Sequence, residues 1–328
     1  MTLTPTVPLG ATGPTVAPLA LGCMGLTGWY GPTDAAESLA TVHAALDAGV
    51  DLLDTGDFYG SGANESLIGR VLDARSDRPR LSVKFGAMRA PDGQFVGYDA
   101  RPAAVKNFAT YSLQRLGVEV IDVYRPARLD PAVPIEDTIG AIADLVKAGY
   151  VRHIGLSEVG PETIRRAAAV HPIVDVQLEY SVISRGPETA IFPVLRELGI
   201  AVTAYGVLSR GLLTGKGPTG PRDFRAMLPR FQGDAHAANL GHADRLAEIA
   251  AARGVSPGQL CVAWALTKPG VVPLIGPRTR AQLADLLAAA AVRLAPDEVA
   301  ALEAAMSAPI EGTRYPGFLM AALDSERA

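Results

Sequence analysis

Three side chains suited to acid–base chemistry follow two neighbouring apolar runs in the sequence. Asp54 and Tyr59 lie within residues 51–65, which read DLLDTGDFYGSGANE, and Lys84 lies near the end of the next apolar run. They provide a carboxylate, a phenol and an ammonium, groups that proteins use to give and take protons. If the two runs form adjacent strands, these side chains can share one site.

The elements that must position these residues form a regular alternation. Short apolar runs bounded by glycine, proline and aspartate are typical of strands covered on both faces. We predict strands at residues 19–24, 51–55, 81–85, 120–124, 153–157, 174–178, 201–205 and 271–275. Amphipathic segments between the strands predict helices at residues 34–48, 101–116, 135–148, 161–170, 188–198 and 279–290.

This alternation predicts an α/β fold, a (β/α)8 TIM barrel. A doubly wound open sheet is the alternative, but no G-x-G-x-x-G segment follows the first strand. Gly- and Pro-rich residues followed by helices at 242–253 and 257–267 predict a long insertion between strands 7 and 8, and residues 296–307 predict a C-terminal extra helix. No linker divides the chain, so we predict one barrel domain over residues 1–328.

The composition excludes several classes of protein. Of the 328 residues, 48% are hydrophobic and 20% are charged, which suits a large core and not a disordered chain. The net charge of -4 argues against a nucleic-acid partner. Cys23 and Cys261 lie far apart, which excludes a disulfide framework and a cysteine-based zinc site, and we predict no metal. Without a signal-peptide pattern or a membrane-spanning stretch, the chain is predicted to be soluble and cytoplasmic, with its oligomeric state open.

In such a barrel, residues at the C-terminal ends of the strands carry the chemistry. Each polar residue there is, taken alone, also compatible with a solvated loop or a satisfied core group. Their convergence on one face favours a shared site. The strand-end positions are Asp54, Lys84, Ala127, Ser157, Gln177 and Tyr205.

Seven segments together form a specific set of motifs. They are residues 49–65, 81–86 (LSVKFG), 118–131 (VEVIDVYRPARLDP), 151–158 (VRHIGLSE), 176–181 (VQLEYS), 204–216 (AYGVLSRGLLTGK) and 274–283 (LIGPRTRAQL). Through these segments the chain resembles the aldo-keto reductase superfamily over nearly its whole length. The resemblance implies a (β/α)8 barrel that transfers hydride between NADPH and a carbonyl or alcohol.

The resemblance also implies catalytic roles for the residues noted first. Tyr59 matches the general acid that protonates the carbonyl oxygen. A free phenol has a pKa near 10, and Lys84 matches the ammonium that lowers it. Asp54 matches the carboxylate that pairs with the lysine and keeps it charged.

One position departs from the family pattern. Members usually carry histidine in a Tyr-x-Gln-His-Arg-x-Asp type segment, whereas residues 124–130 read YRPARLD and place Ala127 there. Strand alternation puts Arg125 on the same side as Ala127. We therefore consider that Arg125 contacts the substrate and stabilises an oxyanion or a carboxylate. The alternative is that Arg125 pairs with a carboxylate and performs no chemistry.

The resemblance implies a cofactor site and a substrate loop. Arg278 is well suited to a 2′-phosphate, so NADP(H) is favoured over NAD(H). Glu158 and Leu286 stand where the family often has asparagine. On the loop near the mouth, Trp29 and Tyr30 are predicted to contact the substrate. The residues that match cofactor contacts are Ser157, Gln177, Tyr205, Leu208, Ser209, Arg210, Gly211, Gly276, Arg278 and Gln282.

Two functions follow from these observations. The first is an NADPH-dependent oxidoreductase that reduces an aldehyde or ketone, weakly or for few substrates because of Ala127. The second is an NADP(H)-binding protein with little catalysis that senses redox state or regulates a partner. The three residues Asp54, Tyr59 and Lys84 favour the enzyme, and Ala127 favours the alternative.

Overall fold

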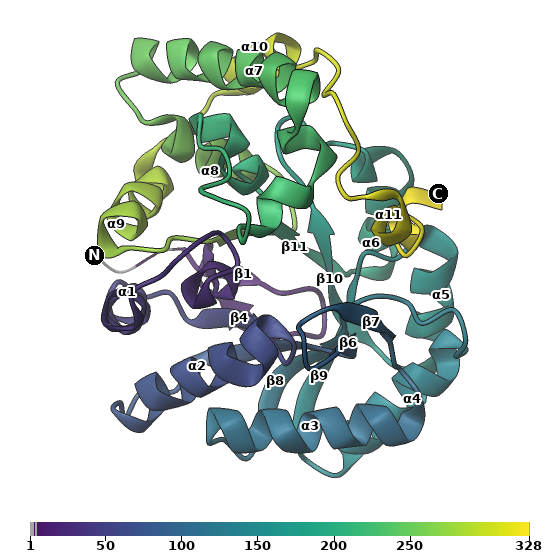
Figure 1. Ribbon diagram of the computed structural model, residues 1–328. Coiled ribbons are helices and arrows are strands. Elements are labelled where there is room, and N and C mark those ends of the chain that lie inside the picture. The colour runs from purple at the N-terminus through teal and green to yellow at the C-terminus, as the bar shows by residue number, and fades with distance from the viewer. Residues whose placement is uncertain (1–2, 4, 328) are drawn as a thin grey trace.

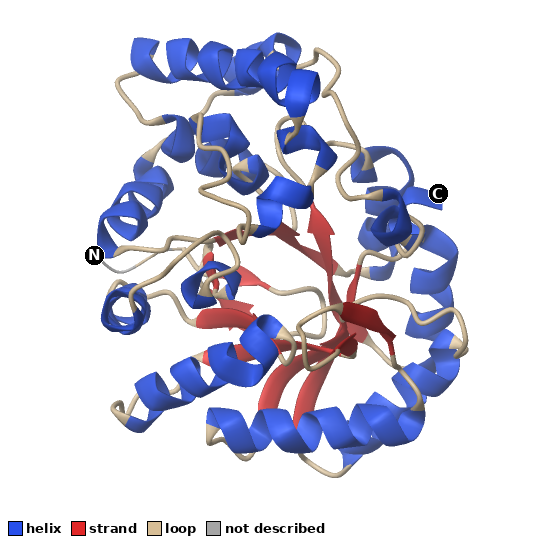
Figure 2. Ribbon diagram, viewed as in Figure 1, coloured by secondary structure: helices blue, strands red, loops and turns tan. Residues whose placement is uncertain are grey.

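The computed structural model describes residue 3 and residues 5–327. Within them, eight parallel strands close into a barrel with helices outside it, which confirms the predicted fold (Figures 1 and 2). Around the barrel the order is β3-β4-β5-β8-β9-β10-β11-β12. The strands are β3 (Ala20–Gly22), β4 (Leu52–Gly56), β5 (Arg80–Phe85), β8 (Ile121–Pro126), β9 (Val151–Ser157), β10 (Ile173–Glu179), β11 (Ala201–Tyr205) and β12 (Val271–Ile275).

The helices occupy the predicted positions between the strands, with one exception. The exception is α2 (Ala63–Asp73), which the sequence analysis did not predict. Its first turn carries Asn64 and Glu65, which are buried although polar, so the apolar periodicity that marks a helix is interrupted there. The others are α1 (Ala35–Asp47), α3 (Pro102–Leu116), α4 (Ile135–Lys147), α5 (Pro161–Val170), α6 (Pro187–Leu198) and α9 (Arg280–Ala288).

The insertion between β11 and β12 contains α7 (Gly233–Ala252) and α8 (Pro257–Leu266), as predicted, but α7 begins at residue 233 and not at 242. The extra helix is α10 (Pro296–Ala305), which lies beside α7 in Figure 1. None of the helices in the described part of the chain is long and apolar enough to cross a membrane.

Three short elements outside the barrel were not predicted. A hairpin of β1 (Val7–Pro8) and β2 (Thr15–Val16) precedes the first barrel strand. A second hairpin, β6 (Ala87–Arg89) and β7 (Phe95–Tyr98), follows β5 and lies in front of the barrel in Figure 1. The short helix α11 (Gly317–Met320) lies near the C-terminus.

A buried ion pair fills the middle of the barrel. Arg125 lies 2.8 Å from Asp175, and both side chains are fully buried. The guanidinium also donates to Ser82 Oγ (2.9 Å), and Thr203 Oγ1 donates to Asp175 (2.6 Å). Arg125 does not line the cavity at the mouth of the barrel. The prediction that it contacts the substrate is wrong, because its charge is already neutralised below the site.

The Arg125–Asp175 ion pair provides a test of what stabilises the barrel. We expect Arg125→Met to lower the free energy of unfolding by about 3–5 kcal/mol, because Asp175 would be left as an uncompensated buried charge. The double variant Arg125→Met/Asp175→Leu should regain much of that stability, since an apolar pair of similar volume needs no neutralisation. Urea unfolding measures the free energy of unfolding of both variants. If Arg125→Met is as stable as wild type, the ion pair does not stabilise the barrel in this way.

Candidate active site

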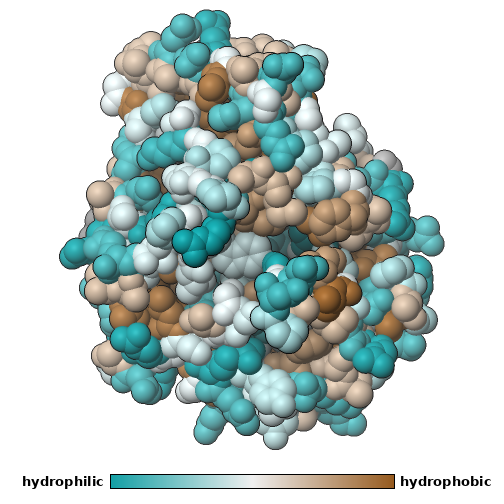
Figure 3. All heavy atoms as spheres, in the orientation of Figure 1, coloured by the Kyte–Doolittle hydropathy of each residue, from teal (hydrophilic) through white to brown (hydrophobic). Residues whose placement is uncertain are grey.

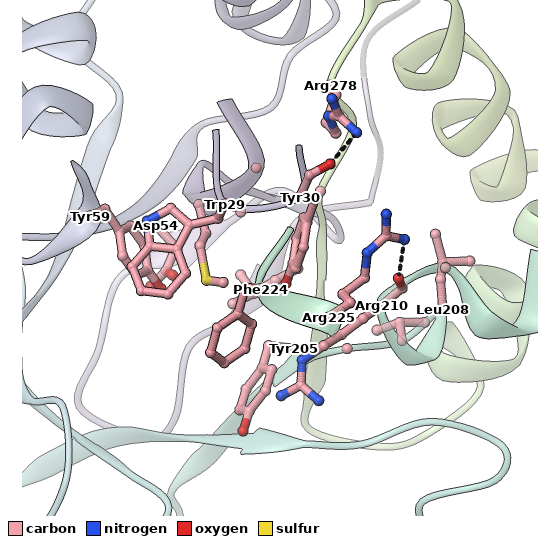
Figure 4. Close-up of a pocket in the computed structure, with 18 of the residues that line it drawn as sticks. Trp29, Tyr30, Asp54, Tyr59, Tyr205, Leu208, Arg210, Phe224, Arg225 and Arg278 are labelled. Atoms are coloured by element: carbon pink, nitrogen blue, oxygen red, sulfur yellow. Dashed lines mark hydrogen bonds between the residues drawn. The ribbon is translucent and has the colours of Figure 1, made fainter. Parts of the chain in front are cut away.

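A cavity of about 870 Å³ opens at the C-terminal end of the barrel. Its lining comes from the strand ends, the β6–β7 hairpin, the insertion and the C-terminal residues. Figure 3 shows polar and apolar groups mixed around the middle of this face. In Figure 4, Asp54 and Tyr59 lie with Trp29 on one side of the cavity, while Arg210 and Arg225 lie on the other.

Asp54 and Lys84 form a buried ion pair at the base of this cavity. Lys84 Nζ donates to one oxygen of Asp54, and the side chains are only 4% exposed. The second oxygen of Asp54 accepts from Ser82 Oγ and from Gln177 Nε2, each at 2.8 Å. The parallel pairing of β4 with β5 places Asp54 opposite Ser82, which brings these two side chains into contact. Burial lowers the pKa of Lys84, while Asp54 acts in the opposite direction.

Tyr59 lies directly after β4, at the start of a short 3-10 helix (Tyr59–Gly62). Lys84 Nζ lies 5.1 Å from the centre of its ring, and Trp29 packs edge-on at 5.8 Å. Burial raises the pKa of Tyr59 well above its ordinary value, with Asp54 adding to the rise and Arg128 opposing it. The prediction of a lowered pKa is therefore wrong for this structure: desolvation outweighs the opposing effect of Arg128, and the phenol is held protonated.

Backbone strain is concentrated around this cavity. Among the described residues, the non-glycine residues with positive φ are Ser61, Glu158, Ser209 and Arg210, with φ between 46° and 55°. Such conformations are unfavourable for residues with a side chain and often occur at functional sites. All four follow barrel strands, in the loops that surround the mouth.

Most of the predicted cofactor residues line the cavity. Two do not: Ser157 and Ser209 are buried behind the wall. Ser157 Oγ lies 3.3 Å from Arg128, so it acts on the cavity through that side chain. The predicted cofactor residues that do line the cavity are Gln177, Tyr205, Leu208, Arg210, Gly211, Gly276, Arg278 and Gln282.

One end of the cavity is cationic. Arg278 donates to the carbonyl oxygens of Tyr30 (2.6 Å) and Pro32 (2.5 Å), and its buried Nε has no partner among the described residues (Figure 4). Burial lowers its pKa, and Arg225 nearby adds to that effect. Lys216 lines the same region and forms no salt bridge within the described chain. Lys216 is exposed and available to an anionic ligand, and the guanidinium of Arg278 meets only carbonyl oxygens.

A neighbouring part of the lining is aromatic. Trp29 and Tyr30 line the cavity, as predicted for substrate contacts. The Trp29 ring packs edge-on against Phe224 at 5.3 Å, and Arg89 from the hairpin lies 4.9 Å above it. Phe95 comes from the same hairpin. This wall suits an apolar or aromatic ligand.

Comparison with known proteins is consistent with this arrangement. The profile of the Aldo/keto reductase family matches residues 18–307. The chain belongs to the aldo/keto reductase family. It is 38% identical to a probable aldo-keto reductase 1 of Glycine max, covering 94% of this chain and 91% of the relative.

Two further relatives cover almost the whole length. The aldo-keto reductase yakc of Schizosaccharomyces pombe, whose name carries NADP(+), is 37% identical, with 92% of each chain covered. The structure of the glycerol dehydrogenase of Gluconobacter oxydans superposes with a TM-score of 0.82 at 28% identity, covering 95% of this chain and 98% of that one.

The C-terminal residues of this aldo/keto reductase complete the site, which sequence reasoning missed. Arg314 pairs with Glu158 at 2.8 Å, and Ser325 Oγ donates to the same carboxylate. Tyr315 places its hydroxyl 3.0 Å from that of Tyr205 and 2.6 Å from Arg210. No local pattern indicates these contacts; the signal in the sequence is Glu158 itself, an acidic residue directly after an apolar strand.

Asp57, in the loop that carries Tyr59, provides a pH-dependent test. Burial raises its pKa to about 7 from an ordinary 3.8, and Glu65 adds to the rise. Because the folded state holds this proton more tightly than the unfolded state, Asp57 lowers stability as the pH rises from about 4 to about 7. The loss is at most about 4 kcal/mol.

We expect Asp57→Asn to remove part of this pH dependence, because the amide is neutral at every pH in this range. Urea unfolding at pH 5 and pH 8 measures it: wild type should lose more stability between the two than the variant. Asp244→Asn, at an exposed position of α7, is the matched control and should behave as wild type. Equal losses in wild type and Asp57→Asn would contradict the assignment.

Proposed function

We propose that this aldo/keto reductase is an NADPH-dependent oxidoreductase that reduces an aldehyde or ketone. The observation that carries the proposal is the position of Tyr59 on the cavity wall, with the Lys84–Asp54 pair beside it. An acid, a cation and a carboxylate are thus brought together at one end of the cavity. We also propose that the chain is a single barrel domain that functions in the cytoplasm. Its two cysteines, Cys23 and Cys261, are buried and free.

We propose that Tyr59 is the general acid. Its raised pKa keeps the phenol protonated at neutral pH, so a proton is available for the carbonyl oxygen. When that proton has moved, the phenolate is stabilised by Lys84, 5.1 Å from the ring, which Asp54 keeps charged. Bound NADPH would supply the hydride. Gln177 fixes the orientation of Asp54 by donating to its second oxygen.

The residues around the cavity fit NADP(H). A dinucleotide phosphate is a polyanion, and the cationic end contains Arg278, which donates to carbonyl oxygens, and Lys216, which pairs with no carboxylate of the described residues. Arg278 would hold the 2′-phosphate, since a planar guanidinium matches phosphate oxygens. Tyr205 contributes an aromatic ring to the lining of the cavity. The NADP(+) in the name of the yeast relative supports the same assignment.

Ala127 limits the reaction. Where aldo-keto reductases usually carry histidine, the methyl group of Ala127 lines the cavity and donates no hydrogen bond. Removing one positioned donor costs roughly 10²–10³-fold in rate. We therefore propose slow or substrate-restricted reduction, with more room for a bulky carbonyl compound.

The second candidate is an NADP(H)-binding protein that senses redox state or regulates a partner. Ala127 is the observation that favours it. The intact group of Asp54, Lys84 and Tyr59 favours the enzyme. Absence of carbonyl reduction with NADPH affinity intact would decide for the sensor.

Tyr59→Phe tests the general acid directly. A stopped-flow single turnover of bound NADPH with a reactive aldehyde isolates the chemical step from cofactor release. We expect the variant to slow NADPH oxidation roughly 10²–10⁴-fold, because the phenol that gives the proton is gone. Equal rates in the two proteins would rule out Tyr59 as the acid, whereas a silent wild type that binds NADPH would favour the sensor.

Arg278→Gln tests the cofactor assignment. We expect the Kd for NADPH to rise roughly 10–100-fold, as for loss of a charge-assisted hydrogen bond, with the Kd for NADH nearly unchanged. Arg280→Gln is the matched control, because Arg280 is exposed and pairs with Glu37 at 2.9 Å. Tryptophan fluorescence titration measures both constants. If Arg278 only stabilises the loop at Tyr30, Arg278→Gln should lower the affinities for NADPH and NADH equally.

A further inference from the structure

Arg128 is a cavity residue to which the mechanism above gives no role. It follows Ala127 directly after β8 and lines the cavity. Its guanidinium donates to the carbonyl oxygen of Ala127 (2.5 Å), to Ser157 Oγ (3.3 Å) and to the hydroxyl of Tyr315 (3.4 Å). All of these acceptors are neutral in the state described, because no carboxylate is among them.

Three other arginines near the mouth each pair with a carboxylate, unlike Arg128, Arg89 and Arg278. Arg210 pairs with Glu179 at 2.9 Å, Arg225 with Asp223 at 2.7 Å, and Arg314 with Glu158 at 2.8 Å. Within residues 3 and 5–327, Arg128 forms no such salt bridge. The carboxylate of Glu158 acts on Arg128 without a hydrogen bond between them, so the guanidinium can still donate to a group that brings negative charge into the cavity.

The charge of Arg128 acts at the position where the reaction takes place. It is the cation that opposes the rise in the pKa of Tyr59, so the guanidinium and the phenol share one electrostatic environment. The two side chains line the same cavity. A substrate oxygen that accepts the proton of Tyr59 is therefore within the field of Arg128.

The hydrogen bonds of Arg128 leave capacity for a ligand. Its bond to Tyr315 is 3.4 Å long, beyond the usual range for N–H···O bonds, and its bond to Ser157 is 3.3 Å long. Weak bonds of this kind are readily exchanged for a shorter one to a developing oxyanion. Arg125, three residues earlier, has no such freedom because Asp175 neutralises it.

We propose that Arg128 is a catalytic residue that donates hydrogen bonds to the substrate carbonyl oxygen, supplying the stabilisation that Ala127 cannot. This inference rests on the proposed reductase function. The carbonyl carbon receives the hydride, the π electrons of the C=O bond move to oxygen, and that oxygen takes the proton of Tyr59. Arg128 remains protonated throughout and stabilises the negative charge that builds on the oxygen.

Single turnover of bound NADPH with a saturating reactive aldehyde tests the proposal. Arg128→Met should slow the chemical step roughly 10²–10³-fold, as for other positioned oxyanion donors. Arg128→Lys should recover part of the rate, because the ammonium keeps the charge and loses the planar fork. NADPH affinity, measured by fluorescence titration, should stay within about threefold of wild type in both variants, which also shows that they fold.

Two further variants separate catalysis from structure. Tyr315→Phe removes the hydroxyl to which Arg128 donates, and Arg165→Met removes an exposed guanidinium that pairs with Glu197 on the outer helices. Arg165→Met should react within a few-fold of wild type, and Tyr315→Phe should slow the chemical step much less than Arg128→Met does. If Tyr315→Phe is as slow as Arg128→Met, Arg128 only anchors the C-terminal residues and the proposal is overturned.

The remaining outcomes are equally distinct. Arg128→Met and Arg128→Lys that both react at the wild-type rate would overturn the role of Arg128 and leave the reductase function standing. A wild type that binds NADPH and reduces no member of a broad carbonyl panel would instead remove the reductase function, and the role of Arg128 with it.

Discussion

The structure depends on the neutralisation of charges inside an apolar barrel. Lys84 pairs with Asp54 at the base of the cavity, and Arg125 pairs with Asp175 below it. Ser82 joins the two pairs, because its hydroxyl donates to Asp54 and accepts from Arg125. Two cations and two anions thus form one connected, neutral group. An unpaired member would carry a large desolvation cost, so the pairs must form together when the barrel closes.

This requirement constrains the register of the strands. Asp54 is opposite Ser82 in the pairing of β4 with β5, and Lys84 is opposite Arg125 in the pairing of β5 with β8. A shift of one residue would turn every side chain of a strand to its other face and leave these charges against the surrounding helices. The same register places Tyr59, just beyond β4, beside the ammonium of Lys84. Structural neutrality and the arrangement of the site therefore have one origin.

Much of this was predictable because the signals are local. The strands have continuous apolar runs, and the carboxyl ends of parallel strands meet at one face, so Asp54 and Lys84 could be placed in one site from the sequence. The hydrogen bonds of Glu158 with Arg314 and Ser325 could not, since they join residues far apart in the chain with no local pattern. The pKa of Tyr59 was predicted in the wrong direction because charge is visible in a sequence and the depth of burial is not.

Arg125 and Arg128 show that residue type alone does not determine which arginine can contact a ligand. Both are arginines near the end of β8: Arg125 lies two residues before Ala127, and Arg128 follows it directly. From the sequence, strand alternation favoured Arg125, which does point into the barrel but meets Asp175 there. Arg128 meets only carbonyl and hydroxyl oxygens at the cavity. A guanidinium already paired with a carboxylate has little further stabilisation to offer a developing oxyanion, whereas one with neutral partners retains it. Whether Arg125 or Arg128 can donate to an oxyanion therefore depends on the partner that the fold gives each guanidinium. That partner is determined only when the barrel closes.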